Sequence, residues 1–515
     1  MKGSGSVDKD MPFGVNITDV CQDPQDQRRL SGNAIKAIAR EHQSSVDPTG
    51  IRMLGAVFCD TLDLIGLDLP YSLVIDKSIF VKGIQARSFH TRGDFSMDES
   101  LITDQLFLAR SHVDGTIFAN KSLISQLQIL DSQVAGSIIL RDTVFLEPVI
   151  VDTVSLAGEL GMSGAAFPYV LVQFSKVGGV FDLTNSQARC AYDIRQSEIG
   201  EIVAVDSGFG TAQNERSFDW RNVEGLTKRI GAARRASPTP KAADDKSCNH
   251  QGIATSPATF LVSDTRIRSS LCLRSFHWLK ANPPQDSYIT FDDVNIGTVA
   301  SIDLISDDTN FDSSENHHFT ILGLETKSLI FDFRGFDGAS RAYNLSLSGL
   351  KFDHAYSMAK TGCDYDPEFA KPRLQTASNP GSDLRLPQVK EVMAWLQSNA
   401  LGTTQPFTAF VEVFQKDGED NAAKDLRIAR ASAELWAKAR HAFGDWTGLG
   451  GSGKPAAAGE PAGGNGFGDR VNAVAAVIFG GRLWLLADHG FHPEKVGWWV
   501  LAAIAVFALY FWVRT

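Results

Sequence analysis

A repeat of 21 to 22 residues is the sequence feature that most constrains the fold. A small residue followed by alternating apolar residues recurs through the first half of the chain. The spacings of its glycine are 22, 21, 22, 21 and 21 residues, at Gly93, Gly115, Gly136, Gly158, Gly179 and Gly200. Two earlier copies lack the glycine but keep the apolar pair, at Ile51/Met53 and Leu73/Ile75. Alternation of this kind is typical of a half-buried strand.

Short strands at a fixed period, with no helical pattern between them, predict a parallel β-helix in which each repeat forms one coil. Neighbouring coils would lie about 4.8 Å apart. A β-sandwich would instead need hairpin turns such as Asn-Gly, and none recurs here. We therefore expect a mainly β protein: a parallel, right-handed β-helix solenoid with a C-terminal helical hairpin and a C-terminal transmembrane helix.

Changes of pattern along the chain predict seven segments. Residues 1–48 are an N-terminal segment with a capping helix, and residues 49–210 form regular coils. Residues 211–257 are an insertion, partly disordered, and residues 258–358 continue the β-helix with irregular spacing and phenylalanines in its interior. Residues 359–445 hold a helical hairpin that caps the β-helix or docks the membrane segment. Residues 446–468 form a Gly/Pro/Ala linker, and residues 469–515 form the membrane segment.

The last apolar stretch predicts a membrane anchor. Val496 to Val513 contains 18 residues without a charge, with Trp498 and Trp499 at one end and Tyr510 and Trp512 at the other. A helix of this length spans about 27 Å, close to a bilayer core, and aromatic residues favour the two interfaces. A buried core helix is the alternative. We expect a single-pass protein whose partner is the lipid bilayer.

A second apolar stretch, from Val471 to Ala487, is interrupted by Gly480, Gly481 and Arg482. An arginine in mid-span is costly, so a helix lying on the membrane surface is favoured over a second span. The two glycines would allow close packing against helices of other subunits. These three residues are therefore candidate interface residues.

Charge and cysteine content exclude several classes of protein. The chain has 60 acidic and 49 basic residues, a net charge of −11, which disfavours nucleic acid as a partner. No two of the six cysteines lie within 20 residues of each other, so a CxxC motif is excluded. We expect Cys59, Cys190 and Cys272 to be buried, inert thiols in a reducing compartment. With no apolar run that could serve as a signal peptide at the N-terminus, the soluble part is expected in the cytoplasm.

The glycine-rich stretch and the histidine pair give weak signals for a bound ligand. Gly448 to Lys454 matches GxxxxGK, but Pro455 replaces the Ser or Thr of a phosphate loop, which favours a flexible linker. His317 and His318 are neighbours on an expected strand, so they would point to opposite faces and rarely share one metal ion. We predict no cofactor and no metal site.

Two acidic pairs, Asp292–Asp293 and Asp307–Asp308, could act as acid and base if they lay on adjacent coils. Turn aspartates that bond to their own backbone are the commoner explanation. We therefore predict no catalytic residue.

Four segments resemble bacterial proteins labelled membrane-associated oxidoreductases, which carry a pentapeptide-repeat-like β-helix. The segments are GIRMLGAVFCDTLDLIGLDLPYSLVIDKSIF, GDFSM, QPFTAFVEVFQKDGEDNAAKDLRIAR and HGFHPEKVGWWVL. The resemblance implies membrane association and an oxidoreductase label. That label does not rest on an identified cofactor motif, so no catalytic residue is carried over.

The function expected from the sequence is that of a membrane-anchored scaffold or interaction protein. It would bind a protein partner, or belong to a membrane complex, through the long side of the solenoid or through the helical hairpin. The alternatives are an oxidoreductase, as the resemblance implies, and a carbohydrate-active β-helix enzyme.

Overall fold

The computed structural model describes residues 17–41, 49–209, 259–278, 287–306, 317–331, 344–358, 384–385, 387–397 and 405–431. The chain forms two compact units, Met1–Pro387 and Gln388–Thr515. Among the described residues, no helix has the length and apolar character needed to cross a membrane. The expected anchor, 496–513, lies outside the described residues.

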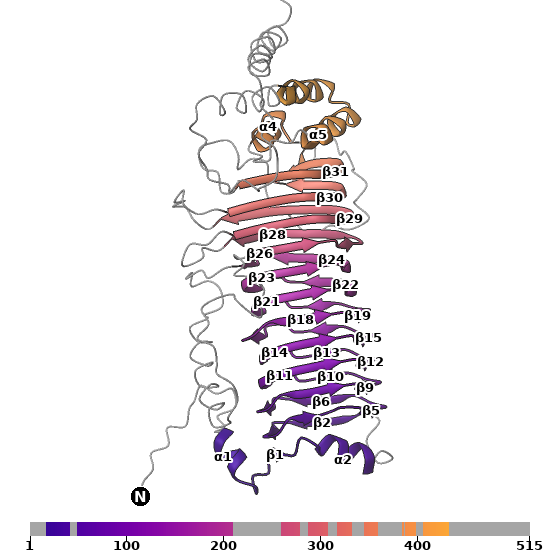
Figure 1. The fold of residues 1–515 in the computed structure, drawn as a ribbon, viewed down its shortest axis with the longest axis vertical. Helices are drawn as coiled ribbons and strands as arrows, with labels where there is room; N and C mark the ends of the chain where they lie inside the picture. The colour runs from indigo at the N-terminus through magenta and orange to yellow at the C-terminus, as the bar shows by residue number, and fades with distance from the viewer. Residues whose placement is uncertain are drawn as a thin grey trace, which may run out of the picture. The chain divides into compact units, whose positions relative to one another are not determined.

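The first unit is a solenoid-like stack of short strands (Figure 1). Thirty-two described strands join one sheet, and their pairings are parallel except for the last, between β31 and β32. The apolar pair Ile51/Met53 of one repeat stands in register with Leu73/Ile75 of the next. The prediction that each repeat contributes equivalent parallel strands is therefore confirmed.

Equivalent strands of successive coils form four rows. The first row contains β2 (Ile51–Leu54), β6 (Leu73–Asp76), β10 (Phe95–Ser96), β13 (Ile117–Phe118), β16 (Ile138–Ile139) and β20 (Leu160–Gly161). The second contains β1 (Arg29–Leu30), β3 (Val57–Phe58), β7 (Ile79–Phe80), β17 (Val144–Phe145) and β25 (Gly208–Phe209). The third contains β4 (Leu62–Asp63), β8 (Ile84–Arg87), β18 (Val149–Asp152) and β26 (Thr259–Ser263). The fourth contains β5 (Asp68–Leu69), β9 (His90–Thr91), β12 (His112–Val113), β15 (Gln133–Val134), β19 (Ser155–Leu156) and β27 (Arg266–Ile267).

Longer strands run through two neighbouring rows. The second and third rows share β11 (Leu101–Ala109), β14 (Leu123–Leu130), β21 (Ala166–Gln173) and β23 (Gln187–Arg195). The fourth and first rows share β22 (Lys176–Asp182) and β24 (Glu198–Val205). The stack continues with β28 (Ser270–Trp278), β29 (Ser287–Ser306), β30 (His317–Phe331), β31 (Asn344–Met358) and β32 (Leu384–Arg385). Residues 210–258, which contain the expected insertion, lie outside the described residues, while β25 and β26 on either side both pair with β23.

Phenylalanines fill the interior of the later coils, as expected. The ring of Phe260 lies 6.1 Å from that of Phe291, which lies 6.2 Å from Phe319 one coil further on. All three side chains are fully buried. Edge-to-face and tilted contacts predominate here, which is the geometry that aromatic pairs prefer.

The corners of the coils repeat at half the period of the strands. A residue with positive φ recurs every 10 or 11 positions, at Lys77, Ser88, Glu99, Arg110, Lys121, Asp131, Asp142 and Thr153 and onward. A buried serine or threonine usually follows it, as in Ser78, Ser100, Ser111, Ser122, Ser132 and Thr143. The five serine hydroxyls accept hydrogen bonds from backbone N–H groups of the preceding coil, so these buried donors are paired at the corners. The Thr143 hydroxyl instead donates to the carbonyl oxygen of Ala119.

The repeated glycine marks a corner where coils approach too closely for a side chain. A Cβ on Gly136 would lie 2.6 Å from the carbonyl oxygen of Gly115, and one on Gly158 would lie 2.6 Å from the carbonyl oxygen of Gly136. Contacts this short cannot be accommodated without moving backbone. The glycine of the repeat is therefore required by packing between coils.

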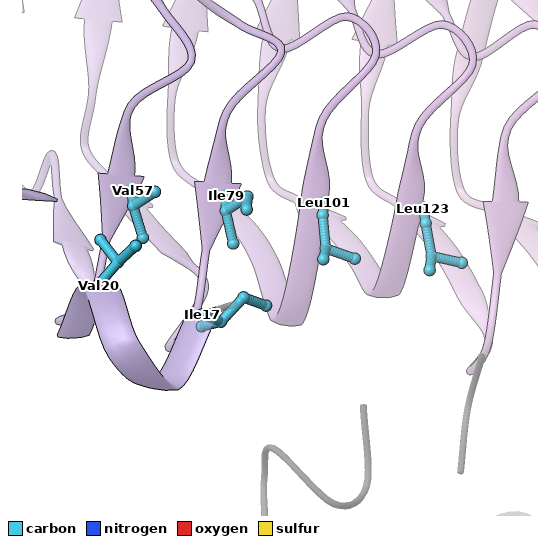
Figure 2. Packing of buried hydrophobic residues seen from close by; sticks show 6 residues of the cluster. All are labelled: Ile17, Val20, Val57, Ile79, Leu101 and Leu123. Atoms are coloured by element: carbon cyan, nitrogen blue, oxygen red, sulfur yellow. The ribbon is translucent and has the colours of Figure 1, made fainter. Parts of the chain in front are cut away.

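The N-terminal segment contributes two helices and a first short strand. β1 pairs with β3, and α2 (Ala34–Glu41) follows it at the same end of the stack (Figure 1). Ile17 and Val20 of α1 (Ile17–Gln22) pack against a row of apolar side chains on strands of the second strand row. Figure 2 shows this row on consecutive coils: Val57, Ile79, Leu101 and Leu123.

The expectation of inert thiols is wrong. Cys21 of α1 and Cys59, which follows β3, form a disulfide with a Cα–Cα distance of 5.6 Å. Cys190 and Cys272 are disulfide-bonded as well. The sequence separation of 38 between Cys21 and Cys59 concealed the pairing, because only the packing of α1 on the first coil brings the two together.

The second unit is helical in its described part. It contains α4 (Val389–Gln397), α5 (Gln405–Lys416) and a further helix over residues 420–431. Trp395 of α4 packs edge-on against Phe410 of α5, with ring centroids 5.9 Å apart. Arg430 donates a hydrogen bond to the hydroxyl of Thr408 at 2.8 Å, joining the last helix to α5. The expectation of helices in this region is confirmed.

Candidate functional site

Most of the residues singled out in the sequence for the membrane lie outside the described residues. This holds for Val496, Trp498, Trp499, Tyr510, Trp512 and Val513, and for Gly480, Gly481 and Arg482.

The acidic pairs can be followed only in part. Asp292 and Asp293 lie on β29, whereas Asp307 and Asp308 lie outside the described residues. Asp292 stands in register with Ser263 and Leu322 of the neighbouring coils. Partial desolvation of its carboxyl group, and then the negative charges of Asp293 and Asp264, raise the pKa of Asp292. Asp293 has a φ of 49°, which places it at a corner. Of the histidine pair, His318 stacks its ring on Tyr288 of the preceding coil, with centroids 4.6 Å apart.

The fourth strand row presents a row of polar side chains to solvent. Its outward residues stand in register from coil to coil, and each is exposed or half-buried. We call them the outer row: Asp68, His90, His112, Gln133, Ser155, Lys176, Glu198, Arg266 and Asn295. The strands β5, β9, β12, β15 and β19, which carry its first part, lie one above another along one edge of the stack (Figure 1).

Ion pairs connect neighbouring coils within this row and beside it. Lys176 Nζ lies 3.7 Å from Glu198 Oε2, and Arg268 Nε lies 3.5 Å from Glu198 Oε1. Arg141 and Glu159 form a closer pair at 2.9 Å on adjacent coils. Exposed pairs of this kind add little to stability. Their consequence is a surface patterned in charge, with carboxylates and cations one coil apart.

Two histidines and two aspartates gather at the beginning of the outer row. The rings of His90 and His112, which are register partners, lie 5.1 Å apart between centroids. Asp114 Oδ1 lies 2.7 Å from His112 Nε2, and Asp114 Oδ2 lies 3.8 Å from His90 Nε2. On the other side, Asp68 Oδ1 lies 3.1 Å from His90 Nδ1. One ligand atom from each of His90, His112 and Asp114 lies within 4.8 Å of the other two.

The register of parallel coils explains this gathering. Residues 22 positions apart occupy the same place on successive coils, so His90 and His112 become neighbours although nothing in their local sequence links them. Asp114 follows His112 by two residues and therefore faces the same side. The sequence holds a signal for this gathering, because the repeat length superimposes His90 on His112, but the apolar alternation that marks the strands does not involve these polar positions.

A second polar cluster lies in the third strand row and is more deeply buried. The Asp193 carboxylate accepts a hydrogen bond from the Tyr169 hydroxyl at 2.8 Å and bonds to the guanidinium of Arg195 through both oxygens. Burial, followed by the charge of Asp193, raises the pKa of Tyr169 far above its ordinary value. The three groups satisfy one another, so this cluster joins adjacent coils.

The outer surface of the solenoid carries a shallow depression. A depression of about 420 Å³ is lined by side chains of successive coils, among them Asp98, Phe118, Asn120 and Arg141. Large apolar side chains exposed among the described residues are single and scattered: Leu54, Ile65, Phe174 and Leu322. Rows of polar side chains are therefore the main feature of this surface.

Comparison with known proteins gives no match, either to a family model, to a curated protein or to a solved structure.

Proposed function

We propose that the protein is a membrane-anchored scaffold whose right-handed parallel β-helix presents rows of side chains to a protein partner. The observation that carries the proposal is the outer row, in which equivalent positions of successive coils align along one edge of the stack. Solenoids use such extended, regular surfaces for binding, because each coil adds one more rung of contact. The anchor would be the segment from Val496 to Val513.

The patterned charge of the outer row supports a polar contact surface. Electrostatic complementarity fixes the register of two surfaces and speeds their encounter more than it adds affinity. A partner with alternating charge at about the 4.8 Å spacing of the coils would match Lys176 and Glu198 on successive coils. The scattered apolar side chains give little support to a mainly hydrophobic interface.

The disulfides indicate on which side of the membrane the β-helix lies. The cytoplasmic expectation depended partly on the spacing of the cysteines, and the Cys21–Cys59 disulfide removes that support. Disulfides persist mainly in oxidising compartments. We therefore place the β-helix on the oxidising side of the membrane. In intact cells, a membrane-impermeant reductant followed by a thiol-reactive polymer should label these cysteines; labelling that needs lysis of the cells would contradict this location.

Membrane attachment is tested by deleting residues 496–513. The full chain should stay in the membrane pellet after alkaline carbonate extraction, and the deleted chain should move to the supernatant. Deletion of linker residues 446–468 is the matched control and should leave the chain in the pellet. Release of the full chain, or retention of the chain without 496–513, would contradict the anchor.

The partner surface is tested by photo-crosslinking in the native membrane. A photo-reactive residue at Gln133 reports on the outer row, and one at Gln415 reports on the exposed side of α5. A discrete protein adduct at Gln133 is expected if the solenoid binds the partner. An adduct only at Gln415 would move the interface to the helices, and the absence of an adduct at both positions would contradict a scaffold that uses either surface.

A further inference from the structure

We propose that His90, His112 and Asp114 form a binding site for a divalent transition-metal ion of the Zn²⁺ class, with Asp68 positioning His90. This inference goes beyond the scaffold function. It rests on the geometry of four side chains at the first coils of the outer row.

The three ligands converge because the backbone places them together. His90 of β9 and His112 of β12 are register partners in the fourth strand row. Asp114 follows β12 directly and faces both imidazoles, with one carboxylate oxygen 2.7 Å from His112 Nε2 and the other 3.8 Å from His90 Nε2. In a zinc site the ligand atoms lie about 2.0–2.2 Å from the ion. Small rotations of these surface side chains bring the three ligand atoms around one ion.

Asp68 gives His90 the arrangement typical of metal-binding histidines. Its carboxylate lies 3.1 Å from Nδ1 of His90, on the far side of the ring from Asp114. When Nδ1 carries the proton and donates a hydrogen bond to the Asp68 carboxylate, Nε2 is left unprotonated and directed toward the ligand group. A carboxylate that holds the other ring nitrogen in this way fixes the tautomer and raises the basicity of the ligating nitrogen.

The donor set selects the class of ion. Two imidazole nitrogens and one carboxylate suit Zn²⁺, Co²⁺, Ni²⁺ or Fe²⁺, whereas Ca²⁺ and Mg²⁺ prefer oxygen ligands alone. Three protein ligands leave a position for water or for a group from a partner. The side chains of His90, His112 and Asp114 are 35%, 45% and 41% exposed, so an ion can reach them from solvent.

Charged and polar groups lie around the site. Asp68 and Asp114 flank the histidines, and Arg92 follows His90 on the same side of the chain. Gln133, the next rung of the outer row, is uncharged.

Co²⁺ titration of the full chain in detergent tests the site directly. The number of bound equivalents is measured by equilibrium dialysis, and the ligand-field absorption of Co²⁺ reports nitrogen ligation. The His90→Ala/His112→Ala double variant should bind one equivalent less than the wild type and lose the corresponding absorption. Gln133→Ala, on the adjacent rung, is the matched control and should retain both. Circular dichroism verifies that each variant is folded.

Two further variants separate ligation from positioning. Asp114→Asn should weaken Co²⁺ binding and change its absorption spectrum, because a ligand oxygen loses its charge. Asp68→Ala should lower the affinity by about 10- to 100-fold while the spectrum at saturation stays the same, because the first ligands are unchanged. The site would be refuted if the double variant bound as many equivalents as the wild type with the same spectrum, or if Gln133→Ala lost binding equally.

Discussion

The backbone N–H of Ser78 donates a hydrogen bond to Oγ of Ser100, 22 residues further along the chain, at 3.1 Å. The amide of Ser100 donates in turn to Oγ of Ser122 at 3.0 Å. Each of these serines follows a residue with positive φ, so one short motif makes the turn and also joins it to the next coil. The corners of the solenoid are thus held by side chains where the strand ladder is interrupted.

Replacing Ser100 by alanine should destabilise the protein by about 1–3 kcal/mol, because the N–H of Ser78 would remain buried without an acceptor. Ser155→Ala is the matched control, since Ser155 is exposed on the outer row. Its effect should stay within about 0.5 kcal/mol. Thermal unfolding followed by circular dichroism compares the two, and equal effects would contradict a structural role for the serine ladder.

A methyl group at the packed corner should be costly for a different reason. In Gly136→Ala the new Cβ would lie 2.6 Å from the carbonyl oxygen of Gly115, and backbone must move. Overpacking of this kind costs about 1–3 kcal/mol. Gly55→Ala is the control: Gly55 has a φ of 71° but no atom within 4 Å of its Cβ position, so it measures backbone strain alone. The shift in melting temperature should be larger for Gly136→Ala, and a larger shift for Gly55→Ala would count against close packing of the coils.

Loss of the Cys21–Cys59 disulfide should weaken the N-terminal end of the stack. The bond closes a segment of 38 residues, for which the chain-entropy account predicts about 3–4 kcal/mol. The Cys21→Ser/Cys59→Ser double variant should expose α1 to limited proteolysis near residues 17–22, with later coils still protected. Identical cleavage patterns for the wild type and the double variant would show that packing of Ile17 and Val20 suffices.

Stability should depend on pH through Asp98. Burial, assisted by the charge of Asp76, raises the pKa of Asp98 against the opposing effect of its hydrogen bonds from Asn120. A raised pKa means that the folded state binds the proton more tightly than the unfolded state. The protein therefore loses this contribution to stability as the pH rises from the unfolded value of Asp98, about 3.9, through its folded value.

The Asp98→Asn variant should accordingly be more stable than the wild type at pH 7 and equal to it at pH 3. The amide keeps the oxygen that accepts from the N–H of Asn120. Asp131→Asn, at an exposed corner, controls for the change in net charge. Melting temperatures measured from pH 3 to pH 7 check the difference, and a constant difference between wild type and Asp98→Asn would contradict the assignment.

The strands could be predicted from the sequence because their apolar residues alternate at a fixed period. Ile51, Leu73 and Phe95 mark the same position on successive coils, and the chain uses them as the pattern indicates. The corners repeat at half this period, as at Lys77–Ser78 and Ser88–Phe89. They are harder to recognise in the sequence because their residue types differ more from one corner to the next than the apolar residues of the strands do. The disulfide and the histidine cluster, by contrast, depend on tertiary packing.

The pairing of Cys21 with Cys59 depends on where α1 docks, which no local pattern specifies. The approach of His90 to His112 depends on the register of the coils, which becomes known only when the repeat length is applied to every position. The candidate site is therefore a product of tertiary alignment.

Native mass spectrometry of the protein released gently from its own membrane tests the central claim most directly. The account predicts the 56.0 kDa chain in a complex of fixed stoichiometry with protein subunits, each chain carrying at most a metal ion. A free chain with an organic cofactor or substrate bound would contradict the scaffold and favour the oxidoreductase or carbohydrate-active alternative.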